Sequence, residues 1–239
     1  MQLIGQGCET FRMAAAAPQG PRGWRTPEEL VAVGFDRSRV VMMNEGHDGL
    51  KRCIRTRRVG QRVLVAAHEA GVRHLAMEAL TPAFAAEANE TRALPVAAGG
   101  YLAQAEMRDL IEDALELGWT LVPYEADMCL RPSEFEHLSS EETNWRDDQQ
   151  ARNLVSVLKA LPGPHPLFVW CGNSHLLKVS VQDLRPMGFR FRELSGIEPF
   201  AIDQLASVRF GGREPFGARW VTAHEAELRS RGVELTRFR

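Results

Sequence analysis

The 239-residue sequence lacks several features that would assign it to a special class of protein. Its charges nearly cancel, with 29 lysine and arginine residues against 31 aspartate and glutamate residues. No excess of positive charge therefore favours nucleic acid. No apolar run approaches the roughly 20 residues that a membrane-spanning helix needs, and no internal repeat is present. We expect a globular protein that binds neither nucleic acid nor membrane.

The few cysteines give no recognisable motif either. They are Cys8, Cys53, Cys129 and Cys171. No two stand at C-x-x-C spacing, which excludes a zinc knuckle and a thioredoxin-like motif. The apolar stretch over 13–17 is shorter than the core of a secretory signal, and Pro18 ends it. We predict reduced cysteines, a cytoplasmic protein, a poorly ordered lead-in over 1–25 and a single domain over 26–239.

Short apolar runs alternate with segments of helical periodicity along the rest of the chain. Strands are expected at 40–43, 74–77, 120–124 and 167–170, with two further possible strands at 189–194 and 199–202. Helices are expected at 27–33, 50–70, 83–91, 101–117 and 141–161, with a polar loop over 127–140. This alternation predicts an α/β fold, with a mainly parallel central sheet flanked by helices.

Polar side chains follow each of the four expected strands. In chain order they are Glu45 with His47, then Glu78, then Glu125, then Asn173 with His175. A glutamate after a strand often serves only the start of the next helix. However, the carboxyl ends of parallel strands meet at one edge of a sheet, where ligands bind in this class of fold. The joint pattern favours a single functional pocket at that edge.

Two helices add charged residues to this edge. Arg57 falls on the apolar face of the first long helix, whereas Arg55 and Arg58 belong to an outward stripe. That apolar face consists of Leu50, Cys53, Ile54, Leu64 and Ala67. A guanidinium on the buried side needs a carboxylate or an anionic ligand. In the later helix, Asp147 extends the buried face by one turn, and Arg146 lies on a stripe beside it.

Several motifs resemble those of the erythromycin esterase and ChaN-like superfamily. The turn Asn44-Glu45-Gly46-His47-Asp48 resembles the Gly-Glu-x-His-Asp motif that ends a strand in ChaN-like proteins. The spacing from Glu45 to Arg57 is similar to that of the erythromycin-esterase arginine, and Glu78 stands where the family closes its second strand. Asn44 replaces the family's usual glycine. These motifs follow the family's order over about residues 40–180.

Two later segments extend the resemblance. The helix start at residues 145–153 is similar to the family's Arg-Asp-x-x-Met-Ala-x-Asn pattern, with Gln150 in place of methionine. Residues 169–175 resemble the segment with which the family closes its site, ending in His175. The resemblance implies an α/β domain with a small-molecule substrate bound at the strand ends.

The residues themselves leave three functional hypotheses open. The first is a hydrolase of an ester, lactone or amide bond, in which His47 is the general base. Glu45 and Glu78 would orient His47, and Arg57 with Asn173 or His175 would stabilise an oxyanion. The second hypothesis uses the same cluster as ligands of a divalent metal ion. The third is a protein that binds haem or another ligand without turnover.

Among these hypotheses we favour the metal-free hydrolase, with no cofactor assigned. No Gly-x-Ser-x-Gly elbow is present, so a serine nucleophile is not expected. We expect His47, Glu45, Glu78 and His175 to be catalytic. Substrate binding is expected at Arg57, Glu125, Arg146, Asp147 and Asn173. The oligomeric state is not set by any of these features.

Overall fold

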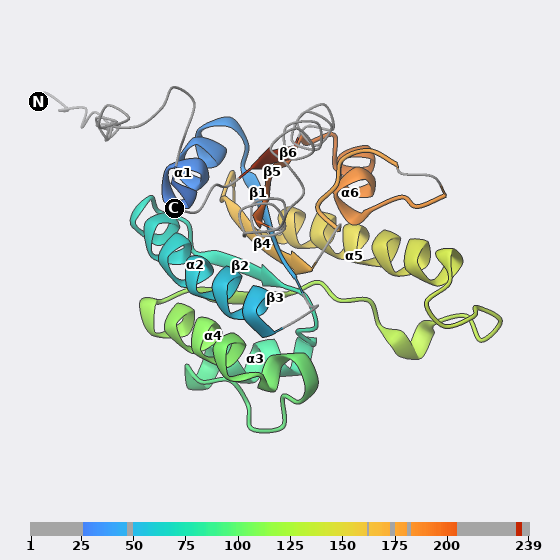
Figure 1. Ribbon diagram of the computed structural model, residues 1–239, viewed down its shortest axis with the longest axis horizontal. Helices are drawn as coiled ribbons and strands as arrows, with labels where there is room; N and C mark the ends of the chain where they lie inside the picture. The colour runs from blue at the N-terminus through green and yellow to red at the C-terminus, as the bar shows by residue number, and fades with distance from the viewer. Residues whose placement is uncertain are drawn as a thin grey trace, which may run out of the picture.

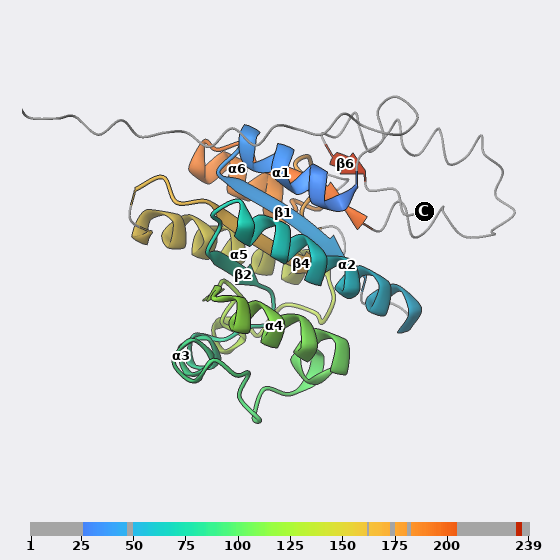
Figure 2. The ribbon, with the colours of Figure 1, turned by 90° about the vertical axis from the view of Figure 1, so that its left-hand side faces the viewer.

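A single parallel sheet with helices on both faces forms the core of the protein. The computed structural model describes residues 26–46, 50–161, 163–172, 175–180, 183–204 and 233–235, and Figures 1 and 2 show the arrangement from two directions. The expected α/β class is confirmed. The predicted lead-in, residues 1–25, lies outside the described residues.

Strands and helices alternate as the sequence predicts. The strands are β1 (Val40–Glu45), β2 (His74–Met77), β3 (Thr120–Pro123), β4 (Leu167–Gly172), β5 (Phe200–Asp203) and β6 (Val233–Leu235). The α-helices are α1 (Pro27–Arg37), α2 (Leu50–Glu69), α3 (Pro82–Thr91), α4 (Ala105–Leu117), α5 (Ser140–Ala160) and α6 (Met187–Ser195). Two short 3-10 helices, η1 (Gly100–Ala103) and η2 (Met128–Leu130), lie in the connections.

The order of strands in the sheet is β3-β2-β4-β1-β5-β6, and every pair is parallel. Strand β4 is therefore inserted between β1 and β2, which precede it in the chain. Glu45 pairs with Gly172, and Met77 pairs with Trp170. This register brings the carboxyl ends of β1, β4 and β2 together, so residues that follow these strands meet at one edge.

Alternate side chains of strands β1 to β5 pack against opposite layers of helices. In β1, Val41 and Met43 belong to the core formed with α1, α2 and α4. Val40 and Met42 belong to the second core, formed with α5 and α6. Because side chains in a strand alternate between the two faces, Glu45 continues the face that α2 covers. In β2, Ala76 packs toward α5, and Glu78 continues that face.

Three predicted elements differ from the structure. Helix α1 continues through Gly34 to Arg37. Gly34 lies within the helix where any side chain would meet Phe200 and Val41, so the glycine permits close packing rather than ending the helix. The possible strand at 189–194 is helix α6, which Gly196 caps with a φ of 69°. Its residues Phe-Arg-Phe-Arg alternate as a strand would, yet Phe191 is buried against α5 and the sheet. The predicted helix at 101–117 begins as η1 and becomes α-helical only at Ala105.

The apolar face predicted for the first long helix is present in α2. Leu64 and Ala67 are buried and Ile54 is half-buried, whereas the side chains of Leu50 and Cys53 lie outside the described residues. Within the part of the chain that the structure describes, no helix combines the length and the low polarity that crossing a bilayer requires.

Candidate functional site

Charged side chains gather at the carboxyl edge of the sheet, above β1, β4 and β2. Neighbouring strands lie about 4.8 Å apart, so β1 and β2 are separated by about 10 Å across β4. Glu45 ends β1, Glu78 follows β2, and His175 follows β4 after three residues. Glu45 and Glu78 are almost completely buried. Each of these two carboxylates pairs with an arginine from the helix that covers its own face of the sheet.

On the α2 face, Glu45 forms a buried ion pair with Arg57. The Nε and Nη2 atoms of Arg57 donate to the two oxygens of Glu45, at 2.8 and 3.2 Å. The third donor, Nη1, reaches Oε1 of Gln104 at 2.6 Å. Both charged side chains are at most 1% exposed. Arg57 thus points inward, as its place on the apolar stripe predicts, whereas Arg58 is exposed and Arg55 is half-buried rather than fully outward.

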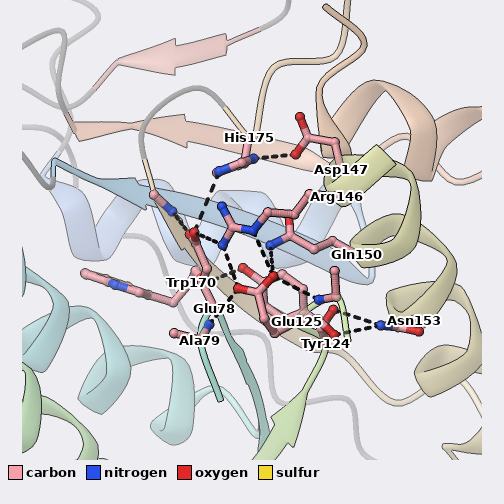
Figure 3. Close-up of polar contacts among 12 residues, drawn as sticks. Glu78, Ala79, Tyr124, Glu125, Arg146, Asp147, Gln150, Asn153, Trp170 and His175 are labelled. Carbon is pink, nitrogen blue, oxygen red and sulfur yellow. Dashed lines mark hydrogen bonds and ion pairs between the residues drawn. The ribbon is translucent and has the colours of Figure 1, made fainter. Parts of the chain in front are cut away.

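On the α5 face, Arg146 joins two strand-end carboxylates (Figure 3). Its Nη2 atom donates to Glu78 at 2.7 Å and to Glu125 at 2.6 Å, and its Nε atom donates to Glu125 at 3.0 Å. Burial works against the charge of Arg146, but hydrogen bonds and the charges of both glutamates outweigh it and raise the pKa of the guanidinium. Arg146 therefore stays charged and fixes the relative position of the ends of β2 and β3.

Glu125 accepts most of the hydrogen bonds that order this network. Besides Arg146 it accepts hydrogen bonds from Gln150 Nε2 at 2.8 Å and from the backbone amides of Ala79 and Ala126 at 3.0 and 2.9 Å. Asn153 donates to the carbonyl oxygens of Tyr124 and Glu125, at 3.1 and 3.0 Å. Both carboxylate oxygens of Glu125 thus accept hydrogen bonds from groups of the protein itself. In this arrangement Glu125 orders Arg146 rather than presenting a free carboxylate to a substrate.

His175 lies between two carboxylates of the same cluster. Its Nδ1 atom is hydrogen-bonded to Asp147, and its Nε2 atom lies 3.7 Å from Oε1 of Glu78. The other oxygen of Glu78 accepts a hydrogen bond from the amide of Gly172. Asp147 is buried at the second turn of α5, one residue after Arg146. Helix α5 therefore delivers both the arginine that holds Glu78 and the aspartate that holds His175.

The environment of His175 favours its charged form. Burial opposes that charge, but the charge of Glu78 and the hydrogen bond to Asp147 outweigh burial and raise the pKa of His175 to about 9. At neutral pH the imidazole is therefore protonated, and both ring nitrogens donate. A protonated histidine cannot accept a proton as a general base, but it can stabilise negative charge or deliver a proton.

Several residues at this edge are not predicted from the sequence. Tyr101 and Gln104 reach Arg57 from the connection between α3 and α4, and Gly99-Gly100 before the tyrosine was the available signal. Asp203 ends β5 and accepts a hydrogen bond from Asn44 Nδ2 at 2.8 Å. The rule that located the other carboxylates, an acidic residue directly after a predicted strand, also fits Asp203.

His47 and Asn173 lie outside the described residues. Within the described ranges, no three or more histidine, cysteine, aspartate or glutamate side chains are grouped so that they could hold a metal ion. The two cysteines with described side chains are free, Cys129 exposed and Cys171 buried.

Comparisons with known proteins relate this chain to others through structure alone. No protein-family model matches the sequence, and no curated protein matches it. A solved structure described as bacterial protein toxins is 16% identical over 70% of this chain and 35% of its own, with a TM-score of 0.52. This likeness shows a shared fold.

Two further structures have lower TM-scores. RRSP, a MARTX toxin effector domain from Vibrio vulnificus, is 20% identical over 63% of this chain and 31% of its own, with a TM-score of 0.46. The haem-binding ChaN of Campylobacter jejuni is 9% identical over 74% of this chain and 85% of its own, with a TM-score of 0.44. The present chain spans about a third of the length of the two toxin structures. The motif resemblance to erythromycin esterases and ChaN-like proteins stays a prediction.

Proposed function

We propose that the protein is a hydrolase of an ester, lactone or amide bond, with its active site at the strand-end cluster of Glu45, Glu78, Asp147 and His175. The observation that carries the proposal is the position of His175. A charged imidazole held between Asp147 and Glu78, at the ligand-binding edge of a parallel sheet, is suited to stabilising an oxyanion.

In the proposed reaction, His47 removes a proton from water while the water oxygen attacks the carbonyl carbon. His47 follows Glu45 by two residues, and a histidine with an ordinary pKa is partly neutral at pH 7. The oxyanion that forms accepts a hydrogen bond from Nε2 of His175, because Asp147 holds Nδ1. When the intermediate collapses, the bond to the leaving group breaks, and the proton held by His47 passes to that group.

Arg146 and Arg57 have supporting roles in this scheme. Arg146 keeps Glu78 beside His175 through a 2.7 Å hydrogen bond, and Arg57 keeps Glu45 at the end of β1. Neither guanidinium is free to bind a substrate anion unless it leaves a buried or half-buried carboxylate. We therefore assign both arginines to positioning the carboxylates, which differs from the substrate-binding role expected from the sequence.

A screen of ester, lactone and amide substrates tests the proposal. For any substrate that is turned over, His47→Ala is expected to lower kcat about 100- to 10,000-fold, as for loss of a general base. His175→Ala is expected to lower kcat about 100- to 1,000-fold, as for loss of an oxyanion donor. The matched control is His165→Ala, since His165 is exposed and precedes β4 at the opposite edge of the sheet.

Chelation separates this mechanism from a metal-dependent one. Turnover that survives exhaustive treatment with a chelator supports His47 as a base. Turnover that is abolished by chelation and restored by Mn²⁺, Co²⁺ or Zn²⁺ would replace it with the metal-dependent hydrolase. Equal activity in His47→Ala, His175→Ala and His165→Ala would contradict the proposed site altogether.

A further inference from the structure

The carboxyl end of β1, which carries Glu45, is held from both sides of the strand. On one side, backbone pairing with β4 continues as far as Glu45 and Gly172. On the other side, backbone pairing with β5 runs to Met43 and Ile202. Beyond this point, hydrogen bonds that involve side chains connect β1 to the end of β5. They join three residues, Asn44, Asp203 and Gln204.

Three hydrogen bonds form this connection, which we call the Asn44 bridge. The Nδ2 atom of Asn44 donates to Oδ1 of Asp203 at 2.8 Å. The backbone amide of Gln204 donates to Oδ1 of Asn44 at 2.8 Å, and its side-chain Nε2 donates to the carbonyl oxygen of Asn44 at 2.7 Å. The three residues are at most 8% exposed. Because these bonds are shielded from water, they hold the end of β1 more firmly than surface bonds would.

Asn44 and Glu45 are neighbours in the chain but lie on opposite faces of the sheet. Asn44 lies on the side of α5, like Met42 two residues earlier. Glu45 lies on the side of α2, where it forms its buried ion pair with Arg57. The bridge and the ion pair therefore hold the same strand end from opposite faces. Since one planar peptide unit joins the two residues, a displacement of Asn44 must also displace Glu45.

We propose that Asn44 is a positioning residue, which holds Glu45 against Arg57 through its bridge to the end of β5. Its effect on catalysis rests on the proposed hydrolase function, because Glu45 belongs to the strand-end cluster of that proposal. Asn44 acts through the backbone of β1 rather than by touching a substrate. Strand β5 thereby supports the candidate site, although none of the residues predicted from the sequence to form the site comes from it.

Four variants separate an intact bridge from a broken one. Asn44→Leu and Asp203→Leu nearly keep the size of the side chain but remove the hydrogen bond between the two residues. Asp203→Asn keeps this bond, because an amide oxygen still accepts from Nδ2 of Asn44. In the double variant Asn44→Asp/Asp203→Asn the bond is reversed, because the introduced amide donates to the introduced carboxylate. The other oxygen of that carboxylate still accepts from the amide of Gln204.

Hydrogen exchange of the Nε–H proton of Arg57, followed by NMR, reports on the ion pair without any substrate. This proton is donated to Glu45 at 2.8 Å. Asn44→Leu and Asp203→Leu are expected to speed its exchange about 10- to 100-fold, because loss of a buried hydrogen bond lets the strand end open more often. Asp203→Asn and the double variant are expected to stay within about threefold of the wild type.

Two controls distinguish positioning from a general loss of stability. The backbone amide of Leu110, buried in α4, reports on opening of the whole fold. Asn144→Leu removes a comparable pair of bonds on α5, where Asn144 donates to the carbonyl oxygen of Asp183 and accepts from the amide of Arg185. This control variant is expected to leave the exchange of the Arg57 proton unchanged.

The Asp203 variants decide the proposal even if Asn44→Leu does not fold. Faster exchange at Arg57 in Asp203→Leu than in Asp203→Asn, with the amide of Leu110 unaffected, supports the positioning role. Equal exchange at Arg57 in these two variants would overturn it. Equal acceleration at Arg57 and Leu110 in the variants with a broken bridge would also overturn it, because the bridge would then stabilise only the fold as a whole.

Kinetics test the consequence for catalysis. Asn44→Leu is expected to lower kcat about 10- to 100-fold with little change in KM, because a displaced Glu45 affects the transition state more than substrate binding. The double variant is expected to recover most of the activity. Full activity in folded Asn44→Leu would overturn the catalytic part of the proposal. If no substrate is turned over, the hydrolase proposal fails, while the exchange measurements still decide whether the bridge positions Glu45.

Discussion

At the scale of single residues, each cation of the cluster is held by a carboxylate from another element. Arg57 of α2 meets Glu45 of β1, Arg146 of α5 meets Glu78 and Glu125, and His175 meets Asp147. Water reaches these groups poorly, so removal of one partner leaves a charge that solvent cannot stabilise. The cost of such a change is therefore larger than for an ion pair on the surface.

The Glu45–Arg57 pair gives the clearest example. Arg57→Met is expected to lower the free energy of unfolding by about 3–5 kcal/mol, because the carboxylate of Glu45 remains buried without its cation. Arg58→Met, one residue later on the exposed face of α2, is expected to change it by less than about 0.5 kcal/mol. Urea unfolding curves measure the free energy of unfolding of both variants. Equal midpoints for the two variants would contradict the buried pair.

The raised pKa of His175 makes stability fall at alkaline pH. A pKa of about 9 in the folded protein, against 6.5 in the unfolded chain, corresponds to about 3 kcal/mol of stability. Because the folded pKa is the higher one, this contribution is complete below pH 6.5 and is lost as the pH rises through 9. Denaturant unfolding at several pH values measures this contribution to stability. NMR titration of the imidazole measures the pKa of His175.

Asp147→Asn serves as the comparison for this titration. The change removes the charged acceptor of the Nδ1 hydrogen bond, so the pKa of His175 is expected to move back toward 6.5. The decline of stability between pH 6.5 and 9 then becomes shallower. If hydrolysis depends on the charged imidazole, its alkaline limb moves to lower pH in the same variant. An unchanged imidazole midpoint would contradict the role assigned to Asp147.

At the scale of secondary structure, helix α2 packs closely at Gly60 against the side chain of Trp170, which belongs to β4. A side chain at Gly60 would come within 2.5 Å of the ring of Trp170 and 2.7 Å of Leu110. Gly60→Ala is therefore expected to destabilise the protein by about 1–3 kcal/mol through overpacking, despite the better helix propensity of alanine. Gly99→Ala, where the nearest atom is 3.9 Å away, is expected to have little effect. Thermal unfolding compares the two variants.

Sequence patterns located most of the elements because the strands are buried on both faces and read as continuous apolar runs. The prediction for β2, residues 74–77, matches its bounds. The sequence does not predict helix α6, because Phe189 and Phe191 alternate with arginines at the period of a strand. The helix is favoured by packing against α5. Local alternation in so short a segment does not distinguish the two.

The cluster was predictable to the extent that it follows strands. Glu45, Glu78 and Glu125 were located by position alone, since parallel strands bring their ends to one edge. Tyr101 could not be located in this way, because it lies in a connection whose path is set by Gly100 and by packing of α4. The sequence likewise does not predict which cation pairs with which carboxylate, because pairing depends on the face of the sheet on which each side chain lies.

At the scale of the whole molecule, Cys171 reports on global unfolding. Its side chain is fully buried in β4 at the centre of the sheet, and burial, with nearby carboxylates, raises the pKa of its thiol. With Cys8 and Cys53 replaced by serine, we expect a thiol reagent to modify exposed Cys129 at once and Cys171 only as the protein unfolds. Mass spectrometry follows both sites. Equal rates of modification of Cys129 and Cys171 in the native protein would contradict the burial of Cys171.

The insertion of β4 between β1 and β2 also sets the order in which the protein can be built during synthesis. When a ribosome has released α4 and β3, the facing edges of β1 and β2 have no strand between them, because residues 167–172 come later. Until then both edges are open to pairing with other chains. Closure depends on contacts between distant parts of the sequence, which slows folding. The cluster is complete only after β4 has joined β1 to β2, because His175 follows β4 in the chain.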